Sequence, residues 1–369
     1  MAQGRKGCGC ALVAVVAVLL VGAIVGWFLV VKPWMEKRRV YEPPPPASGD
    51  EVKVVTLDVG QGDSILIITP GGKTALVDAG EPGDGKIVLA AMKKYGVDHI
   101  DLLIATHAHA DHIGAADEVI RGTSVAHVVY SGVPNTTKNY ADFLKAIDEK
   151  KVDLIRAQPG QTFELGGGAI MRVLAPIEPF FTKEELRSGG NEPNANSVVT
   201  RLDYGAFSML LTGDAEAQTE ERLLKTDANV RATVLKVGHH GSKYATSEQF
   251  LKRGEFKAAI ISAGMDNRYG HPSQEALDRL KAAGIKIYRT DFGGEVLIST
   301  RGQEGDVKIT TAREPKAGED IWAGRPALRD DSAKRGFIDF GDLPPAPKPK
   351  DEAKGTSNTS KSKKAGGER

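Results

Sequence analysis

The stretch LLIATHAHADH, residues 102–112, contains the pattern that decides the fold of this chain. Its first four residues are apolar and predict a short buried strand, after which four possible metal ligands fall within six positions. His107 and His109 are two residues apart, so an extended backbone directs both imidazoles to the same side. Asp111 and His112 stand where a helix is expected to begin, with Asp111 as its N-cap. The pattern predicts that the first two imidazoles bind one ion, while Asp111 and His112 face a second ion.

A structural role for these histidines is the alternative interpretation. A lone histidine on an apolar strand is more often a structural residue than a ligand. Here, however, three of the chain's eight histidines lie within six residues of one another and beside an aspartate. Structural zinc sites more often use cysteine, and the two cysteines, Cys8 and Cys10, are near the N-terminus. The cluster is therefore interpreted as a catalytic metal site.

Length and composition set broad limits on the molecule. The 369 residues can bury one large core or two moderate ones. A net charge of +1 gives no whole-chain reason to expect a polyanionic partner, so contact with nucleic acid requires a local basic surface. Both cysteines precede the globular part, which excludes a disulfide framework there.

The N-terminal region is expected to anchor the chain in a membrane. After a short leader, residues 1–10, an uncharged apolar run covers residues 11–31 and is long enough as a helix to span a bilayer core. A secretory signal peptide is the competing interpretation, but its small-residue cleavage site is lacking. Residues 32–50 form a proline-rich spacer. Basic residues flank the run on both sides and are more numerous after it, which favours a cytoplasmic body; because a short basic leader also suits an exporting signal anchor, the body is expected outside the cytoplasm, with the cytoplasmic orientation as the alternative.

The globular body is expected at residues 51–312, followed by a C-terminal extension, residues 313–369, whose basic part from about residue 341 is disordered. Strands and helices alternate through the body, which predicts two mixed sheets with helices outside them. Strands are expected at residues 52–59, 64–69, 74–77, 102–105, 197–203, 207–212, 233–237, 258–262 and 285–288. Helices are expected at residues 86–95, 216–224, 248–253 and 274–283.

Other residues at expected strand ends can join the histidine cluster. Asp214 follows an apolar strand, where a carboxylate can bridge two cations, although a lone aspartate there is more often a helix cap. His239 and His240 end another apolar strand. Because side chains alternate along a strand, only one of this pair is expected to face the metal.

The motifs LDVGQGDS (57–64), VDAG (77–80), HAHADH (107–112), NANS (194–197), TGD (212–214), HHGS (239–242) and NRYGHP (267–272) occur in this order over about 215 residues. With them, the chain resembles the metallo-β-lactamase superfamily, and within it the hydrolase domain of the ComEC-type DNA-uptake proteins. The resemblance implies a four-layer αββα sandwich with a two-metal site formed by loops of both sheets.

The same resemblance implies a role for individual residues. Two groups of ligands share one carboxylate: His107, His109 and Asp214 for one ion, and Asp111, His112, Asp214 and His240 for the other. Asp78, Asp58 and Asn196 are expected to support these ligands, although aspartates such as Asp58 also form turns. Asp111, His239 and His271 are expected to be catalytic, and Ser242, Lys243, Arg268 and Asn194 to contact substrate. A loop-forming role for His271 and plain solvent exposure of the two basic residues are the alternatives.

One departure from the superfamily concerns the metal. Many members have a further histidine ligand between the HxHxDH motif and the bridging aspartate, whereas here that interval holds only His127, which comes too early. The corresponding loop offers Asn194 and Asn196 instead. An oxygen donor there makes manganese as acceptable as zinc, so two divalent ions, manganese or zinc, are expected.

A metal pair of this kind is suited to hydrolysis of a phosphodiester by activated water. The resemblance therefore predicts a membrane-anchored nuclease or phosphodiesterase that acts on DNA, with a DNA-uptake channel as a possible partner. Two alternatives remain open: a hydrolase of lactams, lactones or cell-wall phosphodiesters, and a non-catalytic binding module that metal stabilises.

Overall fold

The computed structural model describes residues 51–186 and 191–327. The expected leader, membrane span and spacer, residues 1–50, lie outside the described residues, as does the expected disordered tail from residue 341. Among the helices that the structure describes, none has both the length and the apolar character needed to cross a membrane.

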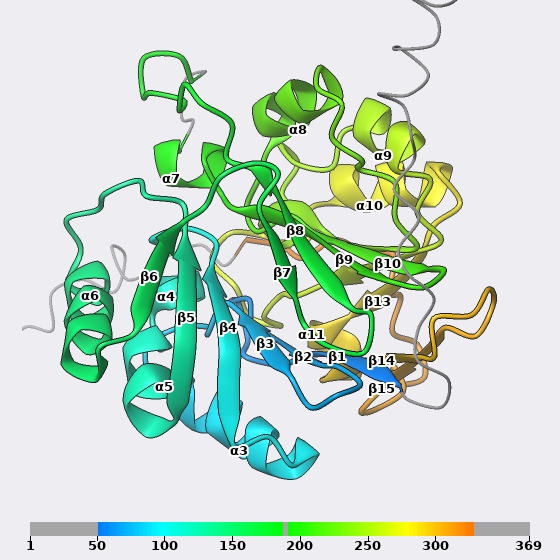
Figure 1. The fold of residues 1–369 in the computed structure, drawn as a ribbon. Helices are drawn as coiled ribbons and strands as arrows, with labels where there is room; N and C mark the ends of the chain where they lie inside the picture. The colour runs from blue at the N-terminus through cyan, green and yellow to red at the C-terminus, as the bar shows by residue number, and fades with distance from the viewer. Residues whose placement is uncertain (1–50, 187–190, 328–369) are drawn as a thin grey trace, which may run out of the picture. The chain divides into compact units, whose positions relative to one another are not determined.

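Two sheets form the centre of the described residues (Figure 1). The first has eight strands in the order β15-β14-β1-β2-β3-β4-β5-β6, and the second has seven in the order β13-β12-β11-β10-β9-β8-β7. The first consists of β1 (Val52–Thr56), β2 (Ile65–Ile68), β3 (Thr74–Val77), β4 (His99–Ala105), β5 (Ser124–Tyr130), β6 (Asp153–Arg156), β14 (Val296–Thr300) and β15 (Lys308–Thr311). The second consists of β7 (Thr162–Glu164), β8 (Ile170–Ala175), β9 (Val199–Tyr204), β10 (Phe207–Leu211), β11 (Val234–Lys236), β12 (Ala258–Ile261) and β13 (Lys286–Arg289).

The helices are placed on the outer faces of the sheets or in the loops between strands. They are α3 (Gly85–Tyr95), α4 (Ala110–Ile113), α5 (Ala116–Gly122), α6 (Lys138–Lys150), α7 (Glu192–Ala195), α8 (Ala217–Leu224), α9 (Glu248–Gly254), α10 (Gln274–Ala282), α11 (Thr290–Gly293) and the short 3₁₀ helix η2 (Gly238–Gly241).

Three apolar cores confirm the expected four-layer sandwich. One core lies between the sheets, where residues such as Ile104 of the first sheet and Leu211 of the second are fully buried. A second joins the first sheet to α3, α5 and α6, and a third joins the second sheet to α8, α9 and α10. Inner strands such as β3 and β10, which are buried along their whole length, thus have apolar side chains on both faces, which explains their near-continuous hydrophobic sequences.

Local signals in the sequence explain where several helices begin. The Ser247 and Ser273 hydroxyls accept the Phe250 and Ala276 backbone N–H groups at the starts of α9 and α10. The expected N-cap at Asp111 is wrong, because α4 begins at Ala110 with His109 as its N-cap. Asp111 lies instead in the first turn of α4, where its negative charge still favours a helix N-terminus.

Residues after 312, which the sequence assigns to an extension, pack against the body as far as they are described. The Arg325 guanidinium lies 2.7 Å from the Asp291 carboxylate, and its backbone N–H donates to the Pro272 carbonyl. The buried Arg289 side chain donates to the carbonyls of Ile321 and Ala323. The segment 313–327 is therefore part of the folded body.

Candidate metal centre

The site forms where parallel strands of both sheets end. Strands β3 and β4 are parallel neighbours in the first sheet, and β10, β11 and β12 are parallel neighbours in the second. The residues that follow these strands include Asp78, the histidine cluster, Asp214 and the His239–His240 pair. Because carboxyl ends of parallel strands share one edge of a sheet, side chains far apart in sequence meet there.

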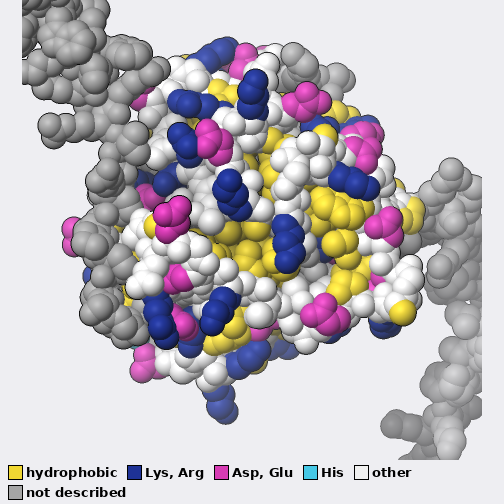
Figure 2. Space-filling model, turned by 90° about the vertical axis from the view of Figure 1, so that its right-hand side faces the viewer, with side chains coloured by type: hydrophobic (Ala, Val, Ile, Leu, Met, Phe, Trp, Pro, Cys, Tyr) yellow, Lys and Arg dark blue, Asp and Glu magenta, His cyan; other side chains and the backbone are white. Residues whose placement is uncertain are grey.

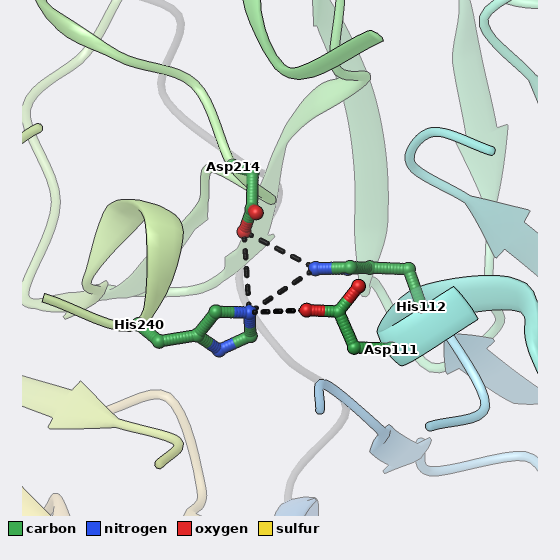
Figure 3. Close-up of side chains that lie close together, drawn as sticks. All are labelled: Asp111, His112, Asp214 and His240. Atoms are coloured by element: carbon green, nitrogen blue, oxygen red, sulfur yellow. Dashed lines mark hydrogen bonds and ion pairs between the residues drawn. The ribbon is translucent and has the colours of Figure 1, made fainter. Parts of the chain in front are cut away.

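Asp214 lies at the centre of the site and its two oxygens face different groups of histidines. Its Oδ1 is 3.2 Å from His112 Nε2 and 3.5 Å from His240 Nε2, which also lies 3.4 Å from Asp111 Oδ2. Figure 3 shows these four side chains converging on a common point. Asp214 Oδ2 instead lies 3.8 Å from His107 Nε2. The structure therefore brings the expected ligands together in two groups on either side of one carboxylate.

Oxygen acceptors outside the site fix the orientation of the inward-facing imidazoles. The Asp78 carboxylate accepts from His112 Nδ1 at 2.7 Å, and the Ser262 carbonyl accepts from His240 Nδ1 at 3.1 Å. In the neutral rings, the proton is thus on Nδ1, and the Nε2 lone pairs point towards each other at 3.3 Å and towards Asp214. Buried lone pairs that converge in this way require a cation or a proton between them. This arrangement fits a divalent metal ion, and His112 has the second carboxylate partner typical of metal-bound histidine.

The second group is held around His107 and His109. His109 Nδ1 lies 2.9 Å from His107 Nε2, while His109 Nε2 lies 3.2 Å from the Asn191 amide nitrogen. Asn194 lies beside His239, with its amide nitrogen 3.4 Å from a nitrogen of that ring, and its Oδ1 is buried without a hydrogen-bond partner among the described residues. An unpartnered buried amide oxygen beside an imidazole group is suited to a cation or its bound water. This oxygen lies on the loop where the sequence has asparagine in place of a further histidine.

The electrostatics of the site favour positive charge at its centre. Burial alone raises the pKa of a carboxyl, but His112, His239 and His240 hold the pKa of Asp214 well below its usual range. Burial lowers the pKa of a histidine, yet Asp214 and Asp63 outweigh it and raise the pKa of His240 to about 10. The same balance of opposing effects raises the pKa of His112 above its ordinary value. Bound metal would replace these protons.

His107 and His109 behave differently because fewer carboxylates face them. Burial lowers the pKa of His107 well below its ordinary value, and it also lowers the pKa of His109. Both imidazoles are therefore neutral at physiological pH. A neutral imidazole is the form that binds a metal ion.

Backbone geometry explains how both His239 and His240 reach the site. Of the pair, only His240 belongs to a group of candidate ligands, as the sequence predicts, but strand alternation is not the reason, because β11 ends at Lys236 and both histidines have left-handed backbones, with φ of 48° and 52°. His239 Nε2 consequently lies 3.6 Å from Asp214 Oδ2, on the opposite side from His240. Left-handed backbone in a non-glycine residue costs about 1–3 kcal/mol, so it persists only where the surrounding structure enforces it.

Close packing requires glycine at two points beneath the site. Gly213 has a φ of 51°, and a Cβ there would lie 2.9 Å from the Thr106 Cβ. A Cβ on Gly62 would lie 2.5 Å from the Asp111 carbonyl oxygen, which accepts the Asp63 N–H. Gly213 thus lets a loop of the second sheet approach the first sheet closely, and Gly62 lets two loops of the first sheet pack together beneath Asp111.

Three supporting residues differ from expectation. Asp58 does not approach the ligands, since its partly exposed carboxylate lies 3.6 Å from Arg313. Asn196 uses its amide to bind the backbone of Phe181 and Glu192, so it fixes a loop and touches no ligand. Ser242, expected to contact substrate, is buried and accepts the Tyr244 N–H within a turn.

Sequence reasoning missed or underrated other supporting residues. Asp63, for which the sequence leaves support of the cluster and turn formation equally open, is buried 2.7 Å from the buried Lys236 ammonium and 3.5 Å from His240 Nδ1. Glu216, placed in the sequence only as the start of a helix, lies 2.9 Å from His239 Nδ1. The lysine within an otherwise apolar strand was the one available signal, because a buried lysine requires a carboxylate partner.

The remaining predicted residues lie around the rim. The His271 ring centroid is 5.3 Å from that of His239, and burial together with the charges of His239 and His240 lowers the pKa of His271 to about 4. His271 is therefore neutral at physiological pH and is a hydrogen-bond donor, not a strong acid. Lys243 and Arg268 are exposed, and Arg268 donates to the Tyr269 hydroxyl.

Several known proteins have sequences similar to that of this chain. Residues 57–264 match the sequence profile of the Metallo-beta-lactamase superfamily. The chain is 31% identical to ComE operon protein 3 of Bacillus subtilis over 72% of this chain and 35% of that protein. It is 30% identical to Recombination protein 2 of Haemophilus influenzae over 67% of this chain and 29% of that protein. The chain spans about a third of the length of these relatives.

A solved structure is also similar. The metallo-beta-lactamase fold protein YhfI from Bacillus subtilis matches 64% of this chain and 96% of its own, at 15% sequence identity and a TM-score of 0.40.

Proposed function

Because the chain belongs to the metallo-beta-lactamase superfamily and is a metal-dependent hydrolase of that fold, we propose that it is a dinuclear phosphodiesterase that cleaves DNA. The observation that carries this proposal is that the two carboxylate oxygens of Asp214 face different groups of ligands: Oδ2 faces His107, and Oδ1 faces His112. Two divalent ions bound there, manganese or zinc, would supply Lewis-acid stabilisation of negative charge at phosphorus and activation of water.

The chain's own residues then position a substrate phosphate. Asp111 is partly exposed at the opening, where it orients groups that approach the His240 side of the centre. His239 is held by Glu216, and the neutral His271 beside it can donate a hydrogen bond to a phosphate oxygen. Lys243 and Arg268 extend into solvent from the two adjoining loops and can pair with neighbouring phosphates.

The choice of DNA is supported by the names of two relatives and by local charge. A third relative, 29% identical over 66% of this chain, is Competence protein ComA of Neisseria gonorrhoeae, and competence and recombination are processes that involve DNA. Figure 2 shows that Lys and Arg side chains are interspersed with Asp and Glu on one face of the molecule. Attraction of a polyanion is therefore expected from the loops around the metal centre and not from that whole face.

We also propose that the apolar run at residues 11–31 anchors the body to a membrane as a single span, with the body outside the cytoplasm. One span cannot itself conduct DNA, so a DNA-uptake channel is the partner that this arrangement suits. Protease treatment of intact cells tests the orientation: cleavage of the body is expected, and full protection of the body would contradict it.

Hydrolysis assays test the proposed reaction. The full-length chain, loaded with manganese or zinc, is incubated with single-stranded DNA, duplex DNA, bis(p-nitrophenyl) phosphate and a chromogenic lactam. We expect DNA cleavage that His107→Ala and Asp214→Ala abolish and that Leu154→Ala, on the distant strand β6, leaves unchanged. Turnover of the lactam without any phosphodiester would refute the proposal, and activity retained in both ligand variants would refute the site.

A further inference from the structure

Exposed aromatic side chains are concentrated beside the metal centre. Four large hydrophobic side chains are strongly exposed among the described residues: Leu154 at 44%, Tyr244 at 61%, Met265 at 47% and Tyr269 at 47%. Three of these four lie on the two loops that follow β11 and β12. Single exposed hydrophobic residues are common on protein surfaces, but their gathering on two loops that also carry His239, His240 and His271 indicates a contact surface.

The two tyrosines lie on loops that are joined directly to the site. The Ser273 N–H donates to the Gly241 carbonyl at 2.9 Å, which links the loop of His239 and His240 to the loop of His271. The Tyr269 ring stacks on the His271 ring at an interplanar angle of 17°, and His271 in turn contacts His239. A continuous series of rings therefore runs from the solvent to the centre.

Tyr244 is placed similarly on the other loop. It comes four residues after His240, and its carbonyl accepts the Ala217 N–H, next to the Glu216 that holds His239. The backbone around Tyr244 is fixed, because the Arg279 guanidinium donates to the carbonyls of Lys243 and Ala245 on either side of it. The Tyr244 ring itself remains exposed. An aromatic ring on a fixed backbone loses little entropy when it binds a flat ligand.

Each tyrosine also has a cationic neighbour. Lys243 Nζ lies 5.1 Å from the centroid of the Tyr244 ring, and the Arg268 guanidinium lies 4.9 Å from that of Tyr269. A ring beside a cation matches a nucleotide, in which a flat base is joined to a negatively charged phosphate. Proteins that bind single strands combine these two elements, because aromatic rings stack on bases and basic groups follow the backbone.

We propose that Tyr244 and Tyr269 stack on unpaired bases of a single DNA strand whose backbone passes the metal centre, so that the enzyme prefers single-stranded over duplex DNA. This rests on the proposed function, and it adds the form of the substrate and two residues that select it. In a duplex, both faces of each base are covered by its neighbours, so neither ring could stack without unpairing the helix. An abasic strand has phosphates but no bases on which the two tyrosine rings could stack.

Fluorescence anisotropy tests this inference without requiring turnover. The full-length chain, kept metal-free by a chelator, is titrated into a labelled thymidine 12-mer, a 12-mer of the same length with abasic sugars, and a 12-base-pair duplex. We expect the wild-type chain to bind the thymidine strand about tenfold or more tightly than the abasic strand or the duplex. In the Tyr244→Ala/Tyr269→Ala double variant, the two single strands should bind within about twofold of each other.

Two controls isolate the aromatic rings. The Tyr244→Phe/Tyr269→Phe variant keeps the rings and should keep the preference for bases. Leu154→Ala removes an exposed hydrophobic residue on β6, away from these loops, and should also keep it. Equal wild-type affinity for thymidine and abasic strands, equally tight duplex binding, or an undiminished preference in the alanine double variant would each overturn the inference. Cleavage of the thymidine strand by the metal-loaded chain is measured separately. If the chain binds bases as expected but does not hydrolyse the strand, only the proposed function is contradicted.

Discussion

Asp214 acquires its properties from the residues around it. Alone in the sequence it resembles a helix cap, whereas in the fold its carboxylate is buried among His112, His239 and His240, which keep it ionised. The HxHxDH motif sufficed to predict the first four candidate ligands because it places them together directly after the apolar strand β4, although none of them lies in the strand itself. Asp63 and Glu216 could not be predicted in the same way, since their partners are more than a hundred and about twenty residues distant, respectively.

A substitution of Asp78 tests the support of the ligands. Its carboxylate accepts from His112 Nδ1 at 2.7 Å and also from the Thr106 backbone and hydroxyl groups. In Asp78→Asn the amide cannot fix the ring in this way, so metal affinity and kcat should fall about 10- to 100-fold. Metal titration by calorimetry measures the affinity. Asp58→Asn is the matched control and should match wild type, because Asp58 faces Arg313; equal losses in both variants would contradict the assignment.

His271 provides a prediction of pH dependence. Its folded-state pKa of about 4 lies below the ordinary value of 6.5, so the native state favours the neutral ring. Its contribution to stability is present above pH 6.5 and is lost as pH falls through about 4, because the unfolded chain binds a proton that the native site rejects. The loss attributable to His271 is about 3 kcal/mol at most.

Urea unfolding of the metal-free chain between pH 7 and pH 4 measures this effect. His271→Asn should lose less stability over this range than wild type. His127→Asn, on the exposed part of β5, is the control for the removal of one histidine outside the site. Superimposable curves for wild type and His271→Asn would show that His271 titrates normally.

Among the secondary-structure elements, those with strong apolar patterns were predictable from the sequence. The strands around β3, β4, β10 and β12 were located within a few residues, because a buried strand between two layers is apolar on both faces. The elements from β5 to β8 were not identified. In β6 and β7 most side chains are exposed or half-buried, so the pattern that marks a strand is weak there. The left-handed backbone of η2 was not predictable either, because two consecutive histidines in a sequence do not indicate a left-handed turn.

The segment that follows β15 gives a prediction at the same scale. Residues 321–325 supply carbonyls to the buried Arg289 and a guanidinium to Asp291, and Arg325 binds the backbone of Pro272, next to His271. Deletion of residues 313–369 should therefore destabilise the body by about 3 kcal/mol, as expected when buried ionic groups lose partners, and should also lower kcat by releasing the His271 loop. Deletion of residues 328–369 is the control.

Thermal unfolding and steady-state kinetics of the two deletions distinguish these outcomes. A body that ends at residue 312 and unfolds at the wild-type temperature would show that the segment 313–327 contributes nothing to the fold.

In the molecule as a whole, the two sheets supply different halves of the metal centre. His107, His109, Asp111 and His112 follow β4 of the first sheet, whereas Asp214 and His240 follow β10 and β11 of the second. The sandwich and the ligand set were both predictable from motif order. The junction between them was not, because it depends on close contacts such as that of Gly213 with Thr106. Metal bound between the sheets would thus link two halves that otherwise meet through an apolar core.

Metal content tests the central claim that Asp214 joins two cation sites. The full-length chain is purified, equilibrated with manganese or zinc, freed of unbound ions and measured by mass spectrometry for metal equivalents per chain. We predict two equivalents in the wild-type protein and at most one in Asp214→Ala. A wild-type protein that retains no more than one equivalent under metal-replete conditions would contradict the dinuclear centre.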